Sequence, residues 1–259
     1  MGRGAARGGA PRRGDQRTGA WRVTEIVVIP LARLLIGTRL RHRERVPQSG
    51  AFILAPNHTS DIDPVIMGIA LYRAGRLPRF LAKASLFRPP VLGGFMRSTG
   101  MIPVERGIVG GSGRGGDPIA AARRVTDTGA AVVIYPEGTL TRDPDLWPMR
   151  GKHGAARLAL AAGVPVIPAA HWGEQAILPR HTKKPRFVPR RTVDVLFGDP
   201  VDLSAFAGRP LDDATLTAAT LAIMQAVTAL VEELRGETAP AERWNPTAHG
   251  QTEFGRPTA

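Results

Sequence analysis

The feature that most constrains this chain is the alternation of short apolar runs with segments of helical periodicity. The runs that indicate strands lie at 51–55, 79–82, 101–104, 131–136, 164–170 and 193–198. Helical patterns occupy 64–73, 117–128 and 151–162, and a last helix is expected at about 212–235. Such alternation is typical of parallel strands joined by crossover helices. The sequence therefore predicts an α/β fold, a single domain with a largely parallel central sheet flanked by helices.

Two segments refine this prediction. Residues 164–170, VPVIPAA, contain two prolines, which lack the N–H donor of an interior strand, so we expect this strand at a sheet edge or bulge. Residues 107–116, GIVGGSGRGG, lack the Lys-Ser/Thr ending of a phosphate-binding P-loop and do not follow the strand–GxGxxG–helix order of a dinucleotide site. We therefore expect a mobile loop there.

Charge is distributed unevenly along the chain. The formal net charge is +13, and residues 1–45 contain 11 arginines against 3 acidic residues. Such an excess favours a polyanionic partner, which could be nucleic acid, an anionic membrane or a phosphorylated substrate. The chain has no cysteine, which excludes disulfides, a thiolate nucleophile and cysteine-bound metal sites.

The N-terminal region divides into two parts. Residues 1–20 are mostly glycine and arginine and are expected to be a disordered basic tail. Residues 21–45 contain an apolar run at 26–36, which a proline and an arginine interrupt. This run is shorter than the roughly 20 apolar residues that a membrane-spanning helix needs. It suits an amphipathic, membrane-associating helical segment that lies in the interface, or else an ordinary helix packed on the core.

Several acid–base groups gather in PNHTSDIDP, residues 56–64. His58 follows an expected strand, and ligands of open α/β sheets bind at the carboxyl ends of strands. Either Asp61 or Asp63 could accept a hydrogen bond from one imidazole nitrogen, which would leave the other to take a proton from a hydroxyl group. In the simpler alternative, Asp63 caps a helix that begins at Pro64, and His58 is a polar loop residue. A metal site is weakly supported, because the turn has only two ligand types.

Two other expected strand ends carry polar residues. GMIPVER, residues 100–106, delivers Arg106 to the end of a strand. YPEGTLT, residues 135–141, is a strand followed by a Pro-Glu-Gly-Thr turn. The backbone N–H groups of that turn and the Thr139 hydroxyl could hold an oxyanion or a phosphate.

Taken in order, His58 with Asp63, then GMIPVER, YPEGT and VPVIP resemble the motifs of the glycerophospholipid acyltransferases. Within this group the chain is most similar to the 1-acyl-glycerol-3-phosphate acyltransferases. The resemblance spans about residues 45–200. Four motifs in the right order are far more specific than any one of them, so the resemblance is strong evidence for fold and activity.

The resemblance implies roles for the matching residues. His58 matches the general base that deprotonates the acceptor hydroxyl, and Asp63, rather than Asp61, matches the aspartate that orients it. Arg106 matches an arginine implicated in binding the acceptor's phosphate. The other matching positions, expected at the substrate, are Lys83, Gly100, Glu137, Gly138 and Thr139.

The third motif departs from the pattern of the group. An arginine and a serine usually follow its threonine, whereas Leu140 and Thr141 stand there in this chain. Either Arg142 or Lys152 then replaces the missing phosphate contact, or the acceptor differs from lysophosphatidic acid. VPVIP, residues 164–168, matches the fourth motif, which shapes the acyl-donor side.

The expected function is that of an O-acyltransferase in phospholipid biosynthesis, at the cytoplasmic face of the cell membrane, peripheral or monotopic. It would move a fatty acyl chain from a thioester co-substrate, acyl-CoA or acyl-carrier protein, to the hydroxyl of a lysophospholipid, and so convert 1-acyl-glycerol-3-phosphate to phosphatidic acid. An anionic membrane surface is the expected partner, and no metal or bound cofactor is expected. The acyltransferase domain would cover residues 46–236, followed by an irregular tail at 237–259.

Three alternatives stay open at this level. The same chemistry serves other acceptors, such as glycerol-3-phosphate or a glycolipid. In a hydrolase, His58 would activate water instead of an alcohol. A non-enzymatic basic protein that binds membrane or nucleic acid would suit the Gly/Arg tail. However, only 5% of the residues are aromatic and no RNA-binding signature is visible, so no specific nucleic-acid partner is expected.

Overall fold

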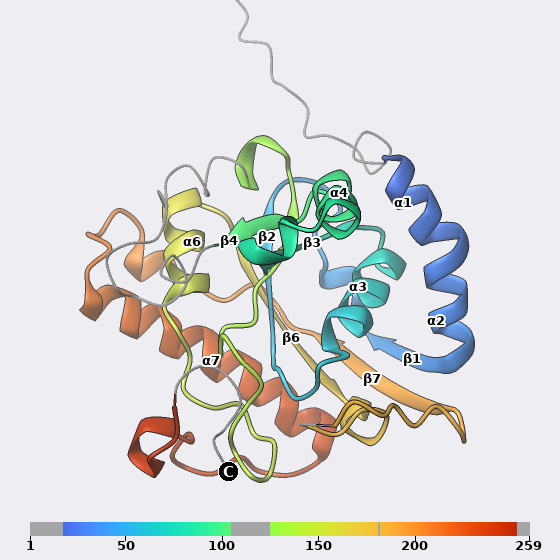
Figure 1. Cartoon of the computed structure of the whole chain (residues 1–259). Helices are drawn as coiled ribbons and strands as arrows, with labels where there is room; N and C mark the ends of the chain where they lie inside the picture. The colour runs from blue at the N-terminus through green and yellow to red at the C-terminus, as the bar shows by residue number, and fades with distance from the viewer. Residues whose placement is uncertain (1–17, 105–124, 181, 253–259) are drawn as a thin grey trace, which may run out of the picture.

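The computed structural model describes residues 18–104, 125–180 and 182–252. Its strands form one seven-stranded sheet in the order β1-β7-β6-β2-β5-β3-β4 (Figure 1). In chain order they are β1 (Ile36–Arg41), β2 (Phe52–Pro56), β3 (Pro78–Lys83), β4 (Ile102–Val104), β5 (Ala131–Val133), β6 (Val166–Trp172) and β7 (Arg191–Phe197). Neighbouring strands are parallel except β6 and β7, which run antiparallel. The fold is therefore α/β with a largely parallel sheet, as the alternating pattern predicts.

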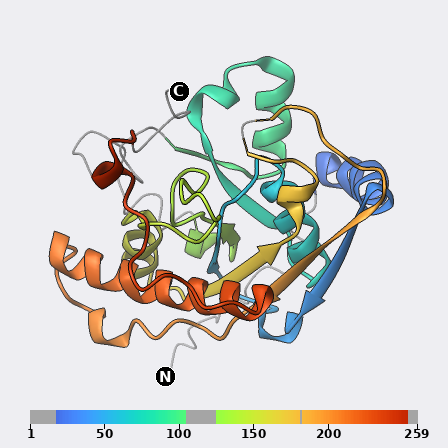
Figure 2. The ribbon, with the colours of Figure 1, turned by 90° about the horizontal axis from the view of Figure 1, so that it is seen from below.

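Helices cover both faces of the sheet (Figure 2). On one face, α3 (Asp63–Arg73) packs against β1 and β3. On the other face, α6 (Gly154–Ala162) and α7 (Asp213–Arg235) pack together against β2, and α7 also contacts β6. The other helical segments are α1 (Gly19–Val23), a π-helical stretch (Thr24–Val28), α2 (Ile29–Leu35), α4 (Pro90–Ser98) and 3-10 turns at Arg43–Arg45, Ala84–Phe87, Glu174–Ala176, Ser204–Phe206 and Pro246–His249.

The centre of the sheet is buried on both sides. Along β2, Phe52 and Leu54 join the core under α3, whereas Ile53 and Ala55 join the core under α6 and α7. A strand that is covered on both faces needs an unbroken apolar run, which explains why AFILA does not alternate with polar residues. β2 therefore gives the loop that follows it a rigid base.

The N-terminal helical segment is shorter than the sequence predicts. We expected an amphipathic segment over 21–45, but the helix ends at Leu35, and Ile36–Arg41 forms β1, paired with β7. From Thr38 onward, half-buried and exposed residues alternate along this strand. That period of two is the pattern of a strand with one covered face, and it directly follows the helical apolar run.

β6 is an interior strand, so the edge or bulge position predicted from its prolines is wrong. It lies between β7 and β2. The Pro168 carbonyl accepts the Gly198 N–H at 2.9 Å, and Gly198 lies just past the end of β7. Pro168 therefore stands at the end of the antiparallel ladder. Its lack of an N–H donor costs no hydrogen bond in the interior of that ladder. Pro165 precedes the strand.

Among the described residues, α7 is long and apolar enough to cross a membrane by length and composition. Half of its most apolar stretch is buried in the protein, and it contacts β6, β2 and β7. Its first turn is capped by Asp212, whose side chain accepts the Thr215 N–H. These contacts are those of a core helix. The loop expected at 107–116 and most of the helix expected at 117–128 lie outside the described residues.

Candidate active site

The loops after β2 and β5 meet at the carboxyl edge of the sheet. These strands are parallel neighbours, so residues 57–62 and 134–141 leave the sheet on the same side. The backbone of His58 is held from two directions. Its N–H donates to Glu137 Oε1 at 2.9 Å, and its carbonyl accepts the Thr141 N–H at 2.7 Å. The first and third sequence motifs therefore form one hydrogen-bonded unit.

Asp63 is the carboxylate that contacts His58. Its Oδ2 lies 2.9 Å from His58 Nδ1, and it also accepts the N–H groups of Thr59 at 2.7 Å and Ser60 at 2.9 Å. Asp63 is fully buried, whereas Asp61 is exposed. The structure thus brings together the two residues that the resemblance pairs.

The capping role considered for Asp63 is not observed. α3 begins at Asp63 itself, Ile62 is the preceding cap residue, and no side chain caps the first turn. The carboxylate instead accepts hydrogen bonds from Thr59 and Ser60, which precede the helix. Asp63 therefore stabilises the loop that carries His58.

The other imidazole nitrogen of His58 is available for chemistry. A carboxylate only accepts hydrogen bonds, so Nδ1 carries the proton and Nε2 has the free lone pair. The His58 side chain is 16% exposed, and its ring stacks on Tyr135 with centroids 4.0 Å apart. Burial, followed by the charges of Asp63 and Glu174, raises the pKa of Tyr135 well above its usual value, so the phenol stays neutral. Such an arrangement can take up a proton through Nε2.

Glu137 is buried beside His58. Its two carboxylate oxygens accept the His58 N–H and, at 3.1 Å, the Met149 N–H. Burial raises the pKa of Glu137 to about 8, although both backbone donors favour the charged form. These contacts give Glu137 a part in holding His58, and its predicted contact with a substrate stays a prediction.

The third-motif turn carries three more of the predicted residues. Gly138 is exposed at φ +74°, and a Cβ there would lie 3.3 Å from Lys152 Cγ. Thr139 is half-buried, and the Lys152 N–H donates to the Pro136 carbonyl at 2.7 Å. The structure therefore places Lys152 beside this turn, whereas Arg142 is largely buried in the segment that follows it.

Gly100 has a structural explanation in the turn before β4. It adopts φ +71°, and a Cβ would lie 2.5 Å from Arg79 Nε. Arg79 in turn donates from Nη1 to the Thr99 carbonyl at 2.6 Å, and burial lowers its pKa to about 10. Arg106 and the side chain of Lys83 lie outside the described residues, so their roles stay predictions.

A second group of buried polar residues lies behind Asp63, and the sequence reasoning missed it. His171, near the end of β6, and Glu174 are fully buried. His171 Nδ1 is 2.9 Å from Glu174 Oε1, and Nε2 is 2.8 Å from the Asn57 carbonyl and 3.9 Å from Asp63 Oδ2. Thr59 Oγ1 donates to the same Glu174 oxygen. The sequence did contain a signal for these residues. HWGE, residues 171–174, stands at the end of an expected strand, and the same position at a strand end drew attention to His58.

Asp63, His171 and Glu174 place potential metal-ligand atoms within 4.8 Å of one another. However, His171 Nε2 donates to the Asn57 carbonyl and so has no lone pair for a metal, and Nδ1 lies 2.9 Å from the Glu174 carboxylate, as in an ion pair. Burial opposes the charge on His171, but Glu174 and Asp63 outweigh it and raise its pKa to about 9. The geometry is that of a buried ion network.

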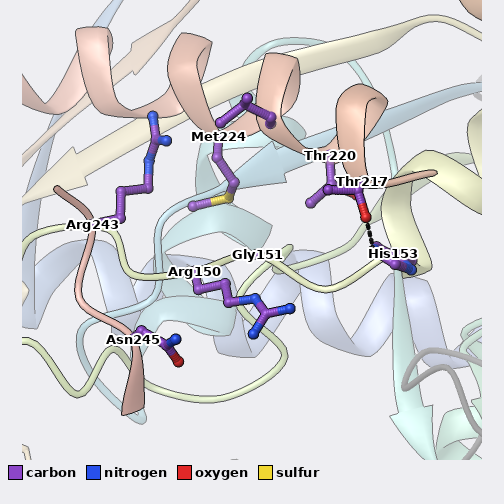
Figure 3. A pocket seen from close by; sticks show the side chains of 9 residues that line it. Arg150, Gly151, His153, Thr217, Thr220, Met224, Arg243 and Asn245 are labelled. Atoms are coloured by element: carbon purple, nitrogen blue, oxygen red, sulfur yellow. Dashed lines mark hydrogen bonds between the residues drawn. The ribbon is translucent and has the colours of Figure 1, made fainter. Parts of the chain in front are cut away.

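A separate hollow of about 290 Å³ lies between α7 and the segments around Arg150 and Arg243 (Figure 3). Its lining residues are Arg150, Gly151, His153, Thr217, Thr220, Leu221, Met224, Arg243 and Asn245. His153 Nε2 and Thr217 Oγ1 are hydrogen-bonded at 3.1 Å, and burial lowers the pKa of His153. His58 is not among the lining residues, so this hollow is distinct from the His58 site.

The profile of a known protein family, described as Acyltransferase, matches residues 37–172 of this sequence. The chain belongs to the acyltransferase family. The matched span covers more than half of this chain and includes His58, Asp63, Glu137 and His171. The recognition made from the four motifs is confirmed.

Two curated relatives are similar to this chain. It is 30% identical over 143 residues to the chloroplastic 1-acyl-sn-glycerol-3-phosphate acyltransferase of Brassica napus, across 55% of this chain and 39% of that protein. It is 26% identical over 185 residues to the 1-acyl-sn-glycerol-3-phosphate acyltransferase of Streptococcus pneumoniae, across 69% of this chain and 61% of that protein. The chain thus covers less than two thirds of the length of either relative.

A solved structure shares the fold. The crystal structure of the 1-acyl-sn-glycerophosphate acyltransferase from Thermotoga maritima superposes with a TM-score of 0.59, over 88% of this chain and 84% of that chain. The sequences are 20% identical. This likeness supports the α/β architecture described above.

Proposed function

We propose that this protein transfers a fatty acyl chain from a thioester to the hydroxyl group of a lysophospholipid. The observation that carries the proposal is the His58–Asp63 pair at the carboxyl edge of the sheet, in which a buried carboxylate holds Nδ1 at 2.9 Å, while the partly exposed ring makes no hydrogen bond through Nε2 to any residue that the structure describes. An alcohol at that edge can give its proton to Nε2. The names of both curated relatives support 1-acyl-glycerol-3-phosphate as the acceptor.

The reaction needs one base and no covalent intermediate. His58 Nε2 takes the proton of the acceptor hydroxyl as its oxygen attacks the thioester carbonyl carbon. The tetrahedral intermediate then collapses, the carbon–sulfur bond breaks, and the thiolate leaves with the proton that His58 returns. Asp63 stabilises the imidazolium that forms between these two steps. The donor is acyl-CoA or an acyl-carrier protein, and the chain's own residues supply the acid–base chemistry without a bound cofactor.

The acceptor's phosphate needs a cation near the same edge. The arginine expected in the third motif is replaced by Leu140, so the candidates are Lys152, which lies beside Gly138, and Arg106. Lys152 is half-buried and held by its backbone bond to Pro136, so it is already in place beside the third-motif turn.

Exposed apolar residues on two neighbouring helices suit docking on the cytoplasmic face of a membrane. On the N-terminal helix, apolar side chains that are 54–74% exposed recur every three or four residues, at Val23, Ile26, Val27, Leu31 and Leu34. The neighbouring α4 exposes Val91 and Phe95, and α1 packs on the end of α4 through Trp21 Nε1, which donates to the Thr99 carbonyl. One apolar face with flanking arginines is typical of an interfacial helix.

The test of the transfer reaction is thiol release from an acyl-CoA, with and without 1-acyl-glycerol-3-phosphate. We compare the wild type, His58→Ala and the control Asp61→Ala, which removes the exposed acid of the same turn. Release that needs both the acceptor and His58, and that survives Asp61→Ala, supports the proposal. Release without acceptor indicates a hydrolase. Release only with glycerol-3-phosphate or a glycolipid identifies another acceptor, and no release with any of them contradicts the proposal.

Membrane docking is tested by flotation with vesicles that contain anionic lipid. Ile26→Glu with Leu34→Glu should abolish binding, because both side chains lie on the exposed apolar face. The control is Val188→Glu, which changes an even more exposed valine in the loop before β7. Equal binding by both variants contradicts docking through this helix.

A further inference from the structure

The ring of His171 has an oxygen acceptor at each nitrogen. Nε2 hydrogen-bonds with the Asn57 carbonyl at 2.8 Å, so it must donate a proton. Nδ1 lies 2.9 Å from Glu174 Oε1, a distance at which a lone pair would be repelled by the carboxylate. The hydrogen bond to Asn57 places a proton on Nε2, and the short contact with the Glu174 carboxylate favours a second proton on Nδ1, which makes His171 an imidazolium.

This cation lies between two buried carboxylates. Asp63 and Glu174 are both fully buried, and their oxygens lie 3.9 Å and 2.9 Å from the nitrogens of His171. Two carboxylates this close to each other in a dry interior cannot both stay ionised unless a positive charge compensates them. His171 provides that charge.

The remaining titratable groups around the network come from other elements. Those described are His58 and Tyr135, which stack on each other, and Glu137, which bonds the His58 N–H. Burial keeps the Tyr135 phenol neutral and raises the pKa of Glu137 to about 8, so neither adds a full negative charge near neutral pH. The charges that His58 meets are therefore those of Asp63, Glu174 and His171.

We propose that His171 is a positioning residue whose buried imidazolium lets Asp63 and Glu174 both stay ionised, and so keeps an ionised Asp63 oxygen on His58 Nδ1. This inference rests on the proposed acyl transfer, because it assigns His171 a role in the same base. With the cation present, Asp63, Glu174 and His171 together carry one net negative charge while His58 is neutral. Once His58 has taken a proton, the four groups together carry no net charge.

His171 also fixes the loop mechanically. The Asn57 side chain donates to the His171 carbonyl at 3.1 Å and accepts the His171 N–H at 2.9 Å. These two bonds use backbone groups of His171, but the ring also donates from Nε2 to the Asn57 carbonyl, so a substitution of His171 can lower activity through lost loop contacts alone. The test needs a readout that packing does not move, and the dependence of activity on pH is such a readout.

The experiment compares pH profiles of acyl transfer for the wild type, His171→Gln and the double variant His171→Gln with Glu174→Gln. His171→Gln leaves two buried carboxylates without a cation, so one of them binds an extra proton. The acid limb of the pH–activity profile should then move up by about one pH unit, which is about a tenfold change in rate at a given pH on that limb. The double variant removes one positive and one negative charge, so its limb returns to the wild-type position. An acid limb that does not move in either variant means a purely structural role and overturns the proposal.

Two further measurements cover the other outcomes. Thermal unfolding identifies a His171→Gln chain that fails to fold, and Glu174→Gln then serves as the second variant, whose acid limb should move down. Nitrogen-15 spectra of the wild-type histidine rings near neutral pH should show one ring with both nitrogens protonated, which His171→Gln removes. This spectrum does not depend on activity, so it tests the imidazolium even if the proposed function fails. A neutral His171 ring overturns the inference.

Discussion

Replacing Glu137 with glutamine should change how the stability of the fold depends on pH. Burial is the largest cause that raises the pKa of Glu137 from 4.5 to about 8. Between these values the folded protein holds this proton more tightly than the unfolded chain does. The stability that Glu137 contributes is therefore fully present below about pH 4.5 and is lost as the pH rises through about 8.

The size of the effect follows from the same shift. At about 1.36 kcal/mol per pKa unit, the wild type should lose on the order of 4 kcal/mol across that window. Glutamine does not titrate, so this slope disappears in the variant. Glutamine also has one acceptor oxygen in place of two, so either His58 or Met149 loses the acceptor of its N–H, at a cost of about 1–3 kcal/mol at every pH. The variant should be the less stable protein near pH 5 and the more stable one above pH 8.

Urea unfolding at a series of pH values between about 5 and 8.5 measures this difference. His171 also releases a proton as the pH rises, but it does so in both proteins and largely cancels in the comparison. The matched control is Glu233→Gln, which changes an exposed glutamate of α7. A difference between wild type and Glu137→Gln that stays constant with pH would refute the reasoning.

Three further predictions concern single residues. Asp63→Asn keeps the shape of the side chain but removes the charge that stabilises protonated His58, so acceptor-dependent thiol release should fall by about 10³–10⁴-fold. A loss below tenfold would contradict the role of Asp63 in stabilising protonated His58. Gly100→Ala should lower the free energy of unfolding in urea by about 1–3 kcal/mol, because φ +71° is strained for alanine and Arg79 must move; unchanged stability would contradict this. Tyr135→Phe removes a buried hydroxyl that has no partner among the described residues, so the free energy of unfolding should stay unchanged or rise by about 1 kcal/mol, with activity within about threefold; a clear loss would show that the hydroxyl is bonded.

The sequence predicted those parts of the fold in which local pattern and burial agree. The FILA run of β2 is apolar throughout because both sheet faces are covered, and the helix over 64–73 has the matching periodicity. β1 was missed because its period of two directly follows a helical apolar run. The predicted edge position of β6 was wrong because a proline excludes only the one backbone hydrogen bond that its own N–H would donate. Pro168 lies where the ladder with β7 ends, so the strand can still be an interior one. Strand order depends on tertiary packing, which no local pattern carries.

The site residues were predicted from the order of the motifs and from their positions at strand ends. This basis finds residues that are close in the sequence and misses contacts between distant segments. His58 and Asp63 are five residues apart, so their pairing can be read locally, and the structure places them in contact. His171 is 114 residues from Asn57, and only the parallel pairing of β2 with β6 makes them neighbours. Glu137 was expected to face a substrate, and its burial could not be read from the turn sequence.

Three strands of the sheet each bring one acidic residue to the same edge: Asp63 follows β2, Glu137 follows β5 and Glu174 follows β6. All three are fully buried, so their charge must be limited or compensated. One is compensated by His171, and another is kept largely protonated at neutral pH by its raised pKa. Raising the pH removes both devices, through about 8 for Glu137 and about 9 for His171. Stability and the positioning of His58 should therefore both decline on the alkaline side, because one buried network controls both.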